Sequence, residues 1–168
     1  NRGEKITTIF VNNAIYGMTG GQMAPTTLVG MKTTTTPYGR NPANEGFPIH
    51  VSEVLKEITG VAFLARTKVS TPQDVNKTKQ LIKKAFMAQI NNVGFGLVEV
   101  LSTCPTNWGL TPVESLKWLE ENMTKEDLIF VDFQEILGDL VVDLIWMTYS
   151  VNFLVLTEAV GDKEDHNL

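Results

Sequence analysis

Apolar residues follow two patterns along the first 122 positions of the chain, one typical of strands and one typical of helices. Short runs of β-branched and aromatic residues, which are typical of buried strands, occupy positions 5–11, 61–65 and 95–101. Around these runs, apolar residues return every three or four positions, as on one face of a helix, over positions 51–58, 71–90 and 111–122. The apolar face of the 71–90 helix is expected to comprise Val75, Ile82, Ala85, Phe86 and Ile90.

Strands that alternate with helices predict crossover connections, and therefore an α/β fold with a parallel sheet covered on both faces. The helices at 71–90 and 111–122 both begin with Thr-Pro and carry an acidic residue three positions after the threonine, which is typical of a capped N-terminus. Ligands of such sheets bind beyond the carboxyl ends of the strands. The loops after Val11 and Leu101 are therefore the expected ligand-binding segments.

The stretch from Gly17 to Pro48 has neither the strand pattern nor the helix pattern. It contains six Gly and four Pro among many Thr and Asn. A long irregular segment inside a compact domain is usually a functional loop, so candidate chemistry is sought there first.

Beyond residue 122 both charge and pattern change. Residues 1–122 carry 12 Lys and Arg against 9 Asp and Glu, whereas residues 123–168 carry 2 against 10. This predicts a boundary, with 1–122 as one domain part and 123–168 as an acidic, amphipathic tail of helical or irregular structure. The tail is expected to pack on a core, with an acidic partner-docking face as the alternative. Its uncharged run at 144–157 is too short to cross a bilayer.

Composition excludes several classes of function. With 43% hydrophobic and 20% charged residues, the chain is expected to be globular. The single cysteine rules out an internal disulfide, and the N-terminus does not resemble a signal peptide, so a cytoplasmic location is expected. No basic run with interleaved aromatics is present, and neither a nucleic acid nor a membrane is expected as a partner.

Three blocks after the first predicted strand carry a family resemblance. Asn12-Asn13 closes the strand, Thr19-Gly-Gly-Gln22 follows, and Ala24-Pro-Thr-Thr27 leads to the threonine-rich segment 33–40. An Asn pair alone is common in turns. Together the blocks resemble the thiamine-diphosphate-binding (beta) subunit of 2-oxoacid:ferredoxin oxidoreductases, and only its C-terminal half. The resemblance covers residues 1–122 and implies a thiamine-diphosphate-binding fold truncated at its N-terminus. The tail does not match the family.

The resemblance also implies roles for residues. The side-chain oxygen of Asn13 and the carbonyl of Ile15 are expected to bind Mg²⁺, which prefers oxygen ligands, while the Gly-Asp-Gly half of the motif is expected upstream of Asn1. The expected cofactor-binding residues are Asn13, Ile15, Gly17, Met18, Thr19, Gly20 and Gly21, with glycine amides close to the diphosphate. Pyruvate-specific relatives carry a polar residue at the position of Met18, so a longer or branched 2-oxoacid is expected here.

Cys104 follows the third predicted strand. A lone cysteine is usually buried and inert, but the resemblance implies that Cys104 is the fourth thiolate of a [4Fe-4S] cluster. The other three cysteines are expected in the N-terminal half of the subunit.

The implied reaction is the oxidative decarboxylation of a 2-oxoacid, such as a branched-chain 2-oxoacid or 2-oxoglutarate, to an acyl-CoA and CO₂, with electrons passed to ferredoxin. The implied partners are the other oxidoreductase subunits, ferredoxin, coenzyme A and the 2-oxoacid. The chain alone is expected to be inactive, and no catalytic residue is assigned. The alternatives are another thiamine-diphosphate enzyme without clusters, and a non-catalytic fragment or interaction module.

Three further residues are candidates outside these motifs. Arg40 is expected to meet a substrate carboxylate or a partner subunit, or else to be a solvated surface residue. His50 is expected in the cap region of a helix rather than as a base, and Arg66 has no assigned role.

Overall fold

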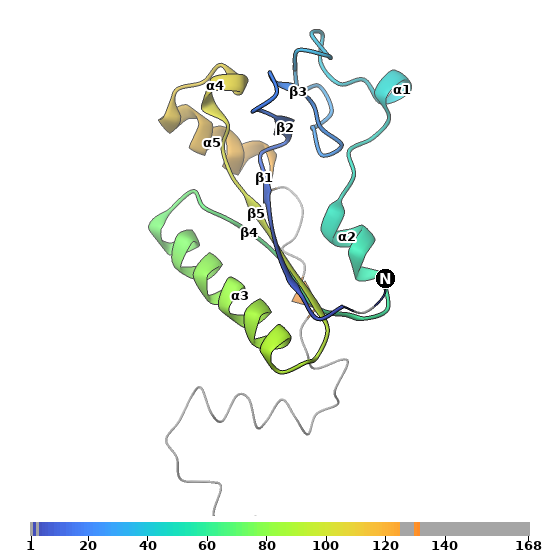
Figure 1. Cartoon of the computed structure of the whole chain (residues 1–168). Coiled ribbons are helices and arrows are strands. Elements are labelled where there is room, and N and C mark those ends of the chain that lie inside the picture. Colours follow the sequence, from blue (N-terminus) through green and yellow to red (C-terminus); the bar gives the residue numbers. More distant parts are fainter. Residues whose placement is uncertain (1, 3, 125–129, 132–168) are drawn as a thin grey trace, which may run out of the picture. The chain divides into compact units, whose positions relative to one another are not determined.

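A four-stranded sheet forms the centre of the fold, in a computed structural model that describes residues 2, 4–124 and 130–131 (Figure 1). Strand β1 (Thr7–Asn12) and strand β4 (Val61–Lys68) both pair in parallel with β5 (Phe95–Leu101), which lies between them. The two-residue strand β6 (Phe130–Val131) pairs antiparallel with β4 and completes the order β1-β5-β4-β6. The predicted α/β fold with a parallel sheet is confirmed.

Helices cover both faces of the sheet. Helix α2 (Val51–Lys56) lies on one face and α3 (Pro72–Ile90) on the other (Figure 1). Beneath α2, Val61, Leu64 and Leu97 form a buried cluster that Leu55 and Ile58 extend. Strands β4 and β5 are therefore withdrawn from water, as their apolar sequences require, whereas Ile9 and Val11 of the edge strand β1 are exposed.

The buried face of α3 differs from the predicted one. Its buried residues are Thr78, Leu81, Ala85 and Ala88, whereas Phe86 is 45% exposed and Ile90 is 68% exposed. The Thr78 hydroxyl lies 2.8 Å from the Thr67 hydroxyl of β4, in the buried layer. A polar residue thus belongs to the packing face. A prediction that uses the spacing of apolar residues alone therefore places that face at the wrong angle around the helix. The predicted capping box at Thr71 is present.

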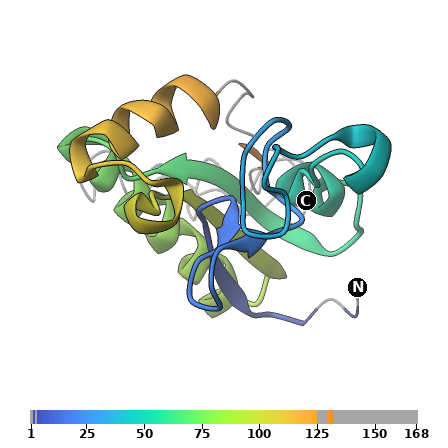
Figure 2. The same ribbon diagram turned by 90° about the horizontal axis from the view of Figure 1, so that it is seen from above.

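The long loop is more ordered than its sequence pattern indicates. It contains a small hairpin of β2 (Ile15–Tyr16) and β3 (Gln22–Met23), and a short helix α1 (Pro42–Glu45). Figures 1 and 2 show the hairpin and helix α4 (Pro105–Trp108) at the same end of the sheet, where β1 and β5 end. The topology therefore gathers the predicted ligand-binding segments in one place.

Arg40 organises the loop, and the alternative of a solvated surface residue was wrong. Its side chain is only 5% exposed and donates hydrogen bonds to backbone carbonyls. The accepting carbonyls belong to Ala24, Pro25, Thr27, Glu45, Gly46 and Phe47, at 2.7 to 3.4 Å. The five N–H donors of a guanidinium thus tie two separate parts of the loop together.

The last helix matches its predicted bounds. Helix α5 (Pro112–Asn122) begins with a capping box at Thr111, and a tilted ring contact with centroids 4.5 Å apart joins Trp118 to Trp108 of α4. Two residues beyond the predicted boundary, Phe130 and Val131, form β6; the rest of the predicted tail from residue 125 lies outside the described residues. No helix in the described ranges has the length and apolarity needed to cross a membrane.

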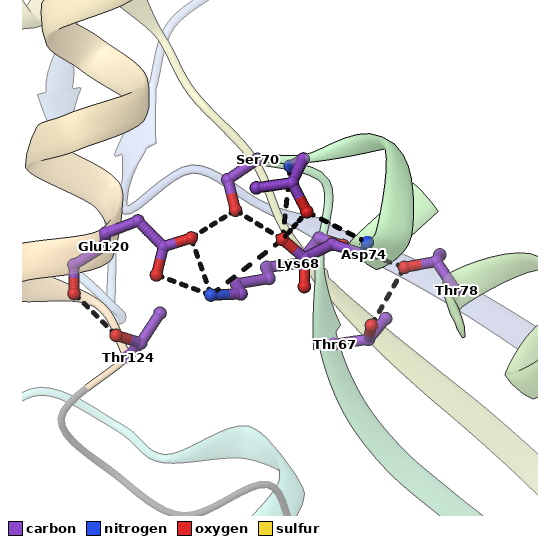
Figure 3. Close-up of polar contacts among 8 residues, drawn as sticks. Thr67, Lys68, Ser70, Asp74, Thr78, Glu120 and Thr124 are labelled. Carbon is purple, nitrogen blue, oxygen red and sulfur yellow. Dashed lines mark hydrogen bonds and ion pairs between the residues drawn. The ribbon is translucent and has the colours of Figure 1, made fainter. Parts of the chain in front are cut away.

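A charged cluster joins α5 to the end of β4 and the start of α3 (Figure 3). Lys68 Nζ donates to Glu120 Oε1 at 2.6 Å, and the Ser70 hydroxyl lies within hydrogen-bond distance of the Glu120 and Asp74 carboxylates, to either of which it can donate its single proton. The hydrogen bonds from Lys68 and Ser70 hold the pKa of Glu120 below its usual value. Burial raises the pKa of Asp74, but hydrogen bonds from Thr71 and Ser70 outweigh it, and the net shift is downward.

These lowered carboxylate pKa values predict a loss of stability in acid. Their stabilising contribution is present above the unfolded-state pKa values of about 4 and is lost as the pH falls through the lower folded-state values. Glu120→Gln is expected to lower the free energy of unfolding by about 0.5–1 kcal/mol at pH 7, because the side chain is partly exposed and screened. Urea unfolding between pH 7 and pH 3 should show a shallower acid loss in this variant.

Glu121→Gln is the matched control, since Glu121 forms only an exposed pair with Lys117 at 3.7 Å. Identical acid slopes for Glu120→Gln and the unaltered chain would contradict the assigned role of the cluster.

Candidate functional site

The loops after β1 and β5 are direct neighbours at the carboxyl end of the sheet. Asn12 lies opposite Leu101 in the β1–β5 pairing, and the Ser102 amide donates to the Asn12 carbonyl at 3.0 Å. The Asn12-Asn13 pair and the segment containing Cys104 therefore leave the sheet side by side.

The turn after β1 is tight and strained. Asn12 Oδ1 accepts from the Ala14 amide at 3.0 Å and from the Thr26 hydroxyl at 2.9 Å. Ala14 has a φ of 57°, a left-handed conformation that disfavours residues with a Cβ. Asn13 Oδ1 accepts from the Ile15 amide at 3.3 Å, so Asn13 and Ile15 belong to the same turn. Asn12 is buried and Asn13 is half-buried.

A buried charged network supports this turn from the sheet. Glu99, only 1% exposed, accepts from Asn12 Nδ2 at 2.8 Å through one carboxylate oxygen. Its other oxygen accepts from the Ser52 hydroxyl at 2.6 Å and from Arg66 Nε at 3.0 Å. Arg66 also donates to both carboxylate oxygens of Glu53, at 2.8 and 2.9 Å. Burial lowers the pKa of Arg66, but Glu99 and Glu53 outweigh burial and raise it.

The hairpin closes on itself through the residues expected at the diphosphate. The Gly21 amide donates to the Tyr16 carbonyl at 2.9 Å, and the Gly20 amide donates to Gly17 at 3.4 Å. The Thr19 hydroxyl donates to Gln22 Oε1 at 2.7 Å. Those groups order the hairpin in this structure, while Met18 is fully exposed at its tip.

Asn107 joins the hairpin to Cys104, a link that sequence reasoning missed. Its amide nitrogen lies 3.2 Å from the Cys104 sulfur and 3.4 Å from the Gly17 carbonyl oxygen. A Cβ on Gly17 would lie 3.0 Å from that sulfur, and one on Gly21 would lie 2.7 Å from Asn107 Oδ1. These two glycines are thus needed for close packing between the loops. In the sequence, the only hint of this packing is that the hairpin is rich in glycine, which leaves room for a side chain such as that of Asn107.

A small apolar cluster lies under the turn and hairpin. Ala14, Ile15 and Met31 are buried, and Cys104 and Trp108 pack against them. The Trp108 Nε1 atom is buried and has no hydrogen-bond acceptor within the described part of the chain. The turn and Cys104 therefore share one supporting core.

The remaining candidates lie away from the hairpin. His50 occupies the N-cap position of α2 but makes no side-chain cap hydrogen bond, which agrees with the predicted cap region. Arg66 lies within the sheet, in the network that contains Glu99.

The arrangement offers hard oxygen ligands and one sulfur. The Asn13 side-chain oxygen and the Ile15 carbonyl suit a cation such as Mg²⁺, whereas the Asn12 oxygen already accepts two hydrogen bonds. Among the residues that the structure describes, no group of three His, Cys, Asp or Glu could hold a metal ion. The turn can therefore supply part of a Mg²⁺ shell, and Cys104 one thiolate of the four that an iron–sulfur cluster requires.

Comparison with known proteins decides the family. Residues 1–100 match the family described as thiamine pyrophosphate enzyme, C-terminal TPP binding domain. The chain belongs to this family. Within it, the resemblance to the thiamine-diphosphate-binding subunit of 2-oxoacid:ferredoxin oxidoreductases is confirmed.

The relatives are oxidoreductase subunits. Ketoisovalerate oxidoreductase subunit VorA of Methanothermobacter marburgensis is 44% identical over 75% of this chain and 26% of its own length. The 2-oxoglutarate synthase subunit KorB of Archaeoglobus fulgidus is 37% identical over 78% of this chain and 45% of its own length. This chain thus spans between a quarter and a half of these relatives.

A solved structure is also similar. It is 2-oxoglutarate:ferredoxin oxidoreductase from Magnetococcus marinus with 2-oxoglutarate, coenzyme A and succinyl-CoA bound. The match has a TM-score of 0.49 and 25% identity, and covers 70% of this chain and 35% of that one.

The contact between Gly21 and Asn107 can be tested against a glycine with the same backbone conformation. Gly21 has a φ of 81° and Gly30 a φ of 77°, but a Cβ on Gly30 would meet nothing within 4 Å. Gly30→Ala is therefore expected to lower the free energy of unfolding by about 1–2 kcal/mol through backbone strain alone. Gly21→Ala should lose at least about 1 kcal/mol more in urea unfolding, because its methyl group also overlaps Asn107.

A double-mutant cycle with Asn107→Ala isolates that overlap, since truncation of Asn107 should recover the additional loss at Gly21. Equal losses for the two glycine variants would contradict close packing of the hairpin against the β5–α4 loop.

Proposed function

We propose that this chain is the thiamine-diphosphate-holding part of an enzyme that oxidatively decarboxylates a branched-chain 2-oxoacid to an acyl-CoA and CO₂, with electrons passed to ferredoxin. The observation that carries this proposal is the strained Asn12–Ile15 turn beside Cys104, at the carboxyl end of a parallel sheet. Thiamine diphosphate supplies the electron sink for decarboxylation, and the protein supplies its position and surroundings.

In the proposed site, Asn13 and Ile15 hold the Mg²⁺ that carries the diphosphate. Their oxygens are of the hard type that Mg²⁺ prefers, and both belong to one rigid turn. The Gly17–Gly21 hairpin lies next in the chain and lines the diphosphate and substrate. Its amides at Gly20 and Gly21 keep the hairpin closed, so its exposed edge and tip face the ligand.

Cys104 is proposed as one ligand of a [4Fe-4S] cluster. Cys104 is half-buried at the N-cap of α4, and its sulfur accepts a hydrogen bond from Asn107, as cluster thiolates commonly do. The closeness of Cys104 to Gly17 supports the proposal that a cluster and the cofactor lie near each other. Such closeness suits electron transfer away from the decarboxylation site.

A branched-chain substrate is favoured over 2-oxoglutarate. The hairpin from Ile15 to Met23 contains no Lys or Arg that could pair with a second carboxylate, and its tip residue Met18 is apolar and fully exposed. The ketoisovalerate oxidoreductase subunit is also more similar to this chain, at 44% identity, than the 2-oxoglutarate synthase subunit at 37%.

The complete enzyme needs parts beyond this chain. The Gly-Asp-Gly segment and three further thiolates are proposed to come from the upstream half of the subunit, and other subunits, ferredoxin and coenzyme A complete the reaction. The chain by itself is accordingly proposed to be inactive, with weak or no binding of thiamine diphosphate.

The test is an assay of the enzyme assembled from the complete subunit and its partner subunits. Coenzyme-A-dependent reduction of methyl viologen is expected with ketoisovalerate at a higher kcat/KM than with 2-oxoglutarate or pyruvate. Met18→Arg should lower the ketoisovalerate to 2-oxoglutarate ratio by about 10-fold or more, because it places a cation beside the substrate side chain.

Tyr38→Arg is the matched control, because Tyr38 is an equally exposed apolar residue elsewhere in the loop region. Absence of coenzyme-A-dependent reduction with every 2-oxoacid would refute the proposed reaction. An unchanged ratio in Met18→Arg would refute the substrate assignment alone.

A further inference from the structure

Glu99 is a buried carboxylate whose partners lie on three other elements. It sits in the central strand β5 and receives hydrogen bonds from Asn12 of β1, Ser52 of α2 and Arg66 of β4. A buried ion pair usually contributes little net stability compared with apolar packing of the same volume. Its presence between the buried Val98 and Val100 of β5 therefore calls for another reason.

Charge compensation of Arg66 is not the whole reason, because Glu53 shares it with Glu99. Arg66 donates two short hydrogen bonds to Glu53, in a bidentate ion pair of the kind that a guanidinium favours. Glu99 also accepts a hydrogen bond from Asn12, through the carboxylate oxygen that is not bonded to Arg66 or Ser52.

This contact determines which way the Asn12 amide faces. A carboxylate paired with a guanidinium accepts hydrogen bonds, so the nitrogen of the amide is the atom that faces Glu99. The amide oxygen of Asn12 must then face the opposite side, where the Ala14 amide and the Thr26 hydroxyl both donate to it. Without Glu99, the Asn12 amide could face the other way, and its NH₂ group would then lie against the Ala14 and Thr26 donors, with which it cannot form these hydrogen bonds.

The Asn12 oxygen in turn stabilises a strained backbone. Ala14 adopts a left-handed conformation, and such strain persists only where the surroundings impose it. The hydrogen bond from the Ala14 amide to Asn12 and the one from the Thr27 hydroxyl to the Ala14 carbonyl, at 2.6 Å, impose it here. The conformation of Ala14 sets the relative directions of Asn13 and Ile15 on either side.

We propose that Glu99 is a positioning residue for the metal–diphosphate site, acting through Asn12 to hold Asn13 and Ile15 in the geometry that Mg²⁺ requires. The inference rests on the proposed function, because it assumes that the turn binds Mg²⁺ with thiamine diphosphate. Ser52 and Arg66 hold the Glu99 carboxylate in place, so α2 and β4 also contribute to the geometry of the turn.

The test is Glu99→Gln in the assembled enzyme, with Mg²⁺ titrated at a fixed concentration of thiamine diphosphate and cofactor binding followed by quenching of tryptophan fluorescence. The half-saturating Mg²⁺ concentration is expected to rise about 10- to 100-fold, the usual effect of losing an indirect metal-site partner. Asn12→Ala should give a similar rise, and the double variant should add little to it, because both residues act along one path.

Thr78→Val is the matched control. It removes a buried hydrogen bond on the opposite face of the sheet and should lower thermal stability without raising the half-saturating Mg²⁺ concentration. An equal rise in Thr78→Val and Glu99→Gln, or no rise in Glu99→Gln, would overturn the positioning role. If Glu99→Gln does not fold, Asn12→Ala decides, since it removes the contact with Glu99 and keeps the Glu99–Arg66 ion pair; an unchanged Mg²⁺ requirement then overturns the proposal.

Failure of the proposed function is distinguishable in the same experiment. If the unaltered enzyme binds no thiamine diphosphate at any Mg²⁺ concentration, both the function and the role of Glu99 are refuted. If it binds and Glu99→Gln leaves the half-saturating Mg²⁺ concentration unchanged, as Thr78→Val does, the role of Glu99 alone is refuted.

Discussion

The left-handed conformation of Ala14 is the constraint around which the candidate site is arranged. An alanine adopts it only under pressure from neighbouring groups, and here those groups come from separate parts of the chain. Asn12, itself held by Glu99, accepts the Ala14 amide, while the Thr27 hydroxyl donates to the Ala14 carbonyl. Behind Thr27, the buried Arg40 guanidinium binds backbone carbonyls of the same segment. The turn is thus supported from the sheet on one side and from the loop on the other.

A small number of contacts also joins the two loops at the end of the sheet. Because β1 and β5 are paired, the segments that follow them are adjacent, and Asn107 fills the space between the hairpin and Cys104. Gly17 and Gly21 leave room for that amide. A rigid hairpin next to a sulfur ligand is what a site that combines thiamine diphosphate with an iron–sulfur cluster would need, since loose loops would vary the distance that electrons must cross.

Much of the fold follows from local patterns, and much of the site does not. The strands, the two capped helices and the meeting of the loops after Val11 and Leu101 were predictable, because periodicity and capping are encoded within a few residues. The packing face of α3 was predicted wrongly because Thr78 is buried through a partner 11 positions away. Arg40 and Glu99 were beyond prediction for the same reason: their partners are set by how distant segments meet. The family motif located Asn13, Ile15 and Cys104, and their chemistry stays a prediction.

The most direct test of the account is the position of the divalent metal in crystals of the complete enzyme grown with thiamine diphosphate and Mn²⁺ in place of Mg²⁺. Anomalous scattering locates Mn²⁺ independently of any assumed ligand. The peak is expected in direct contact with the side-chain oxygen of Asn13 and the carbonyl oxygen of Ile15, with Asn12 turned away toward Glu99. A Mn²⁺ peak bound to the diphosphate but remote from the Asn12–Ile15 turn would contradict the proposed site.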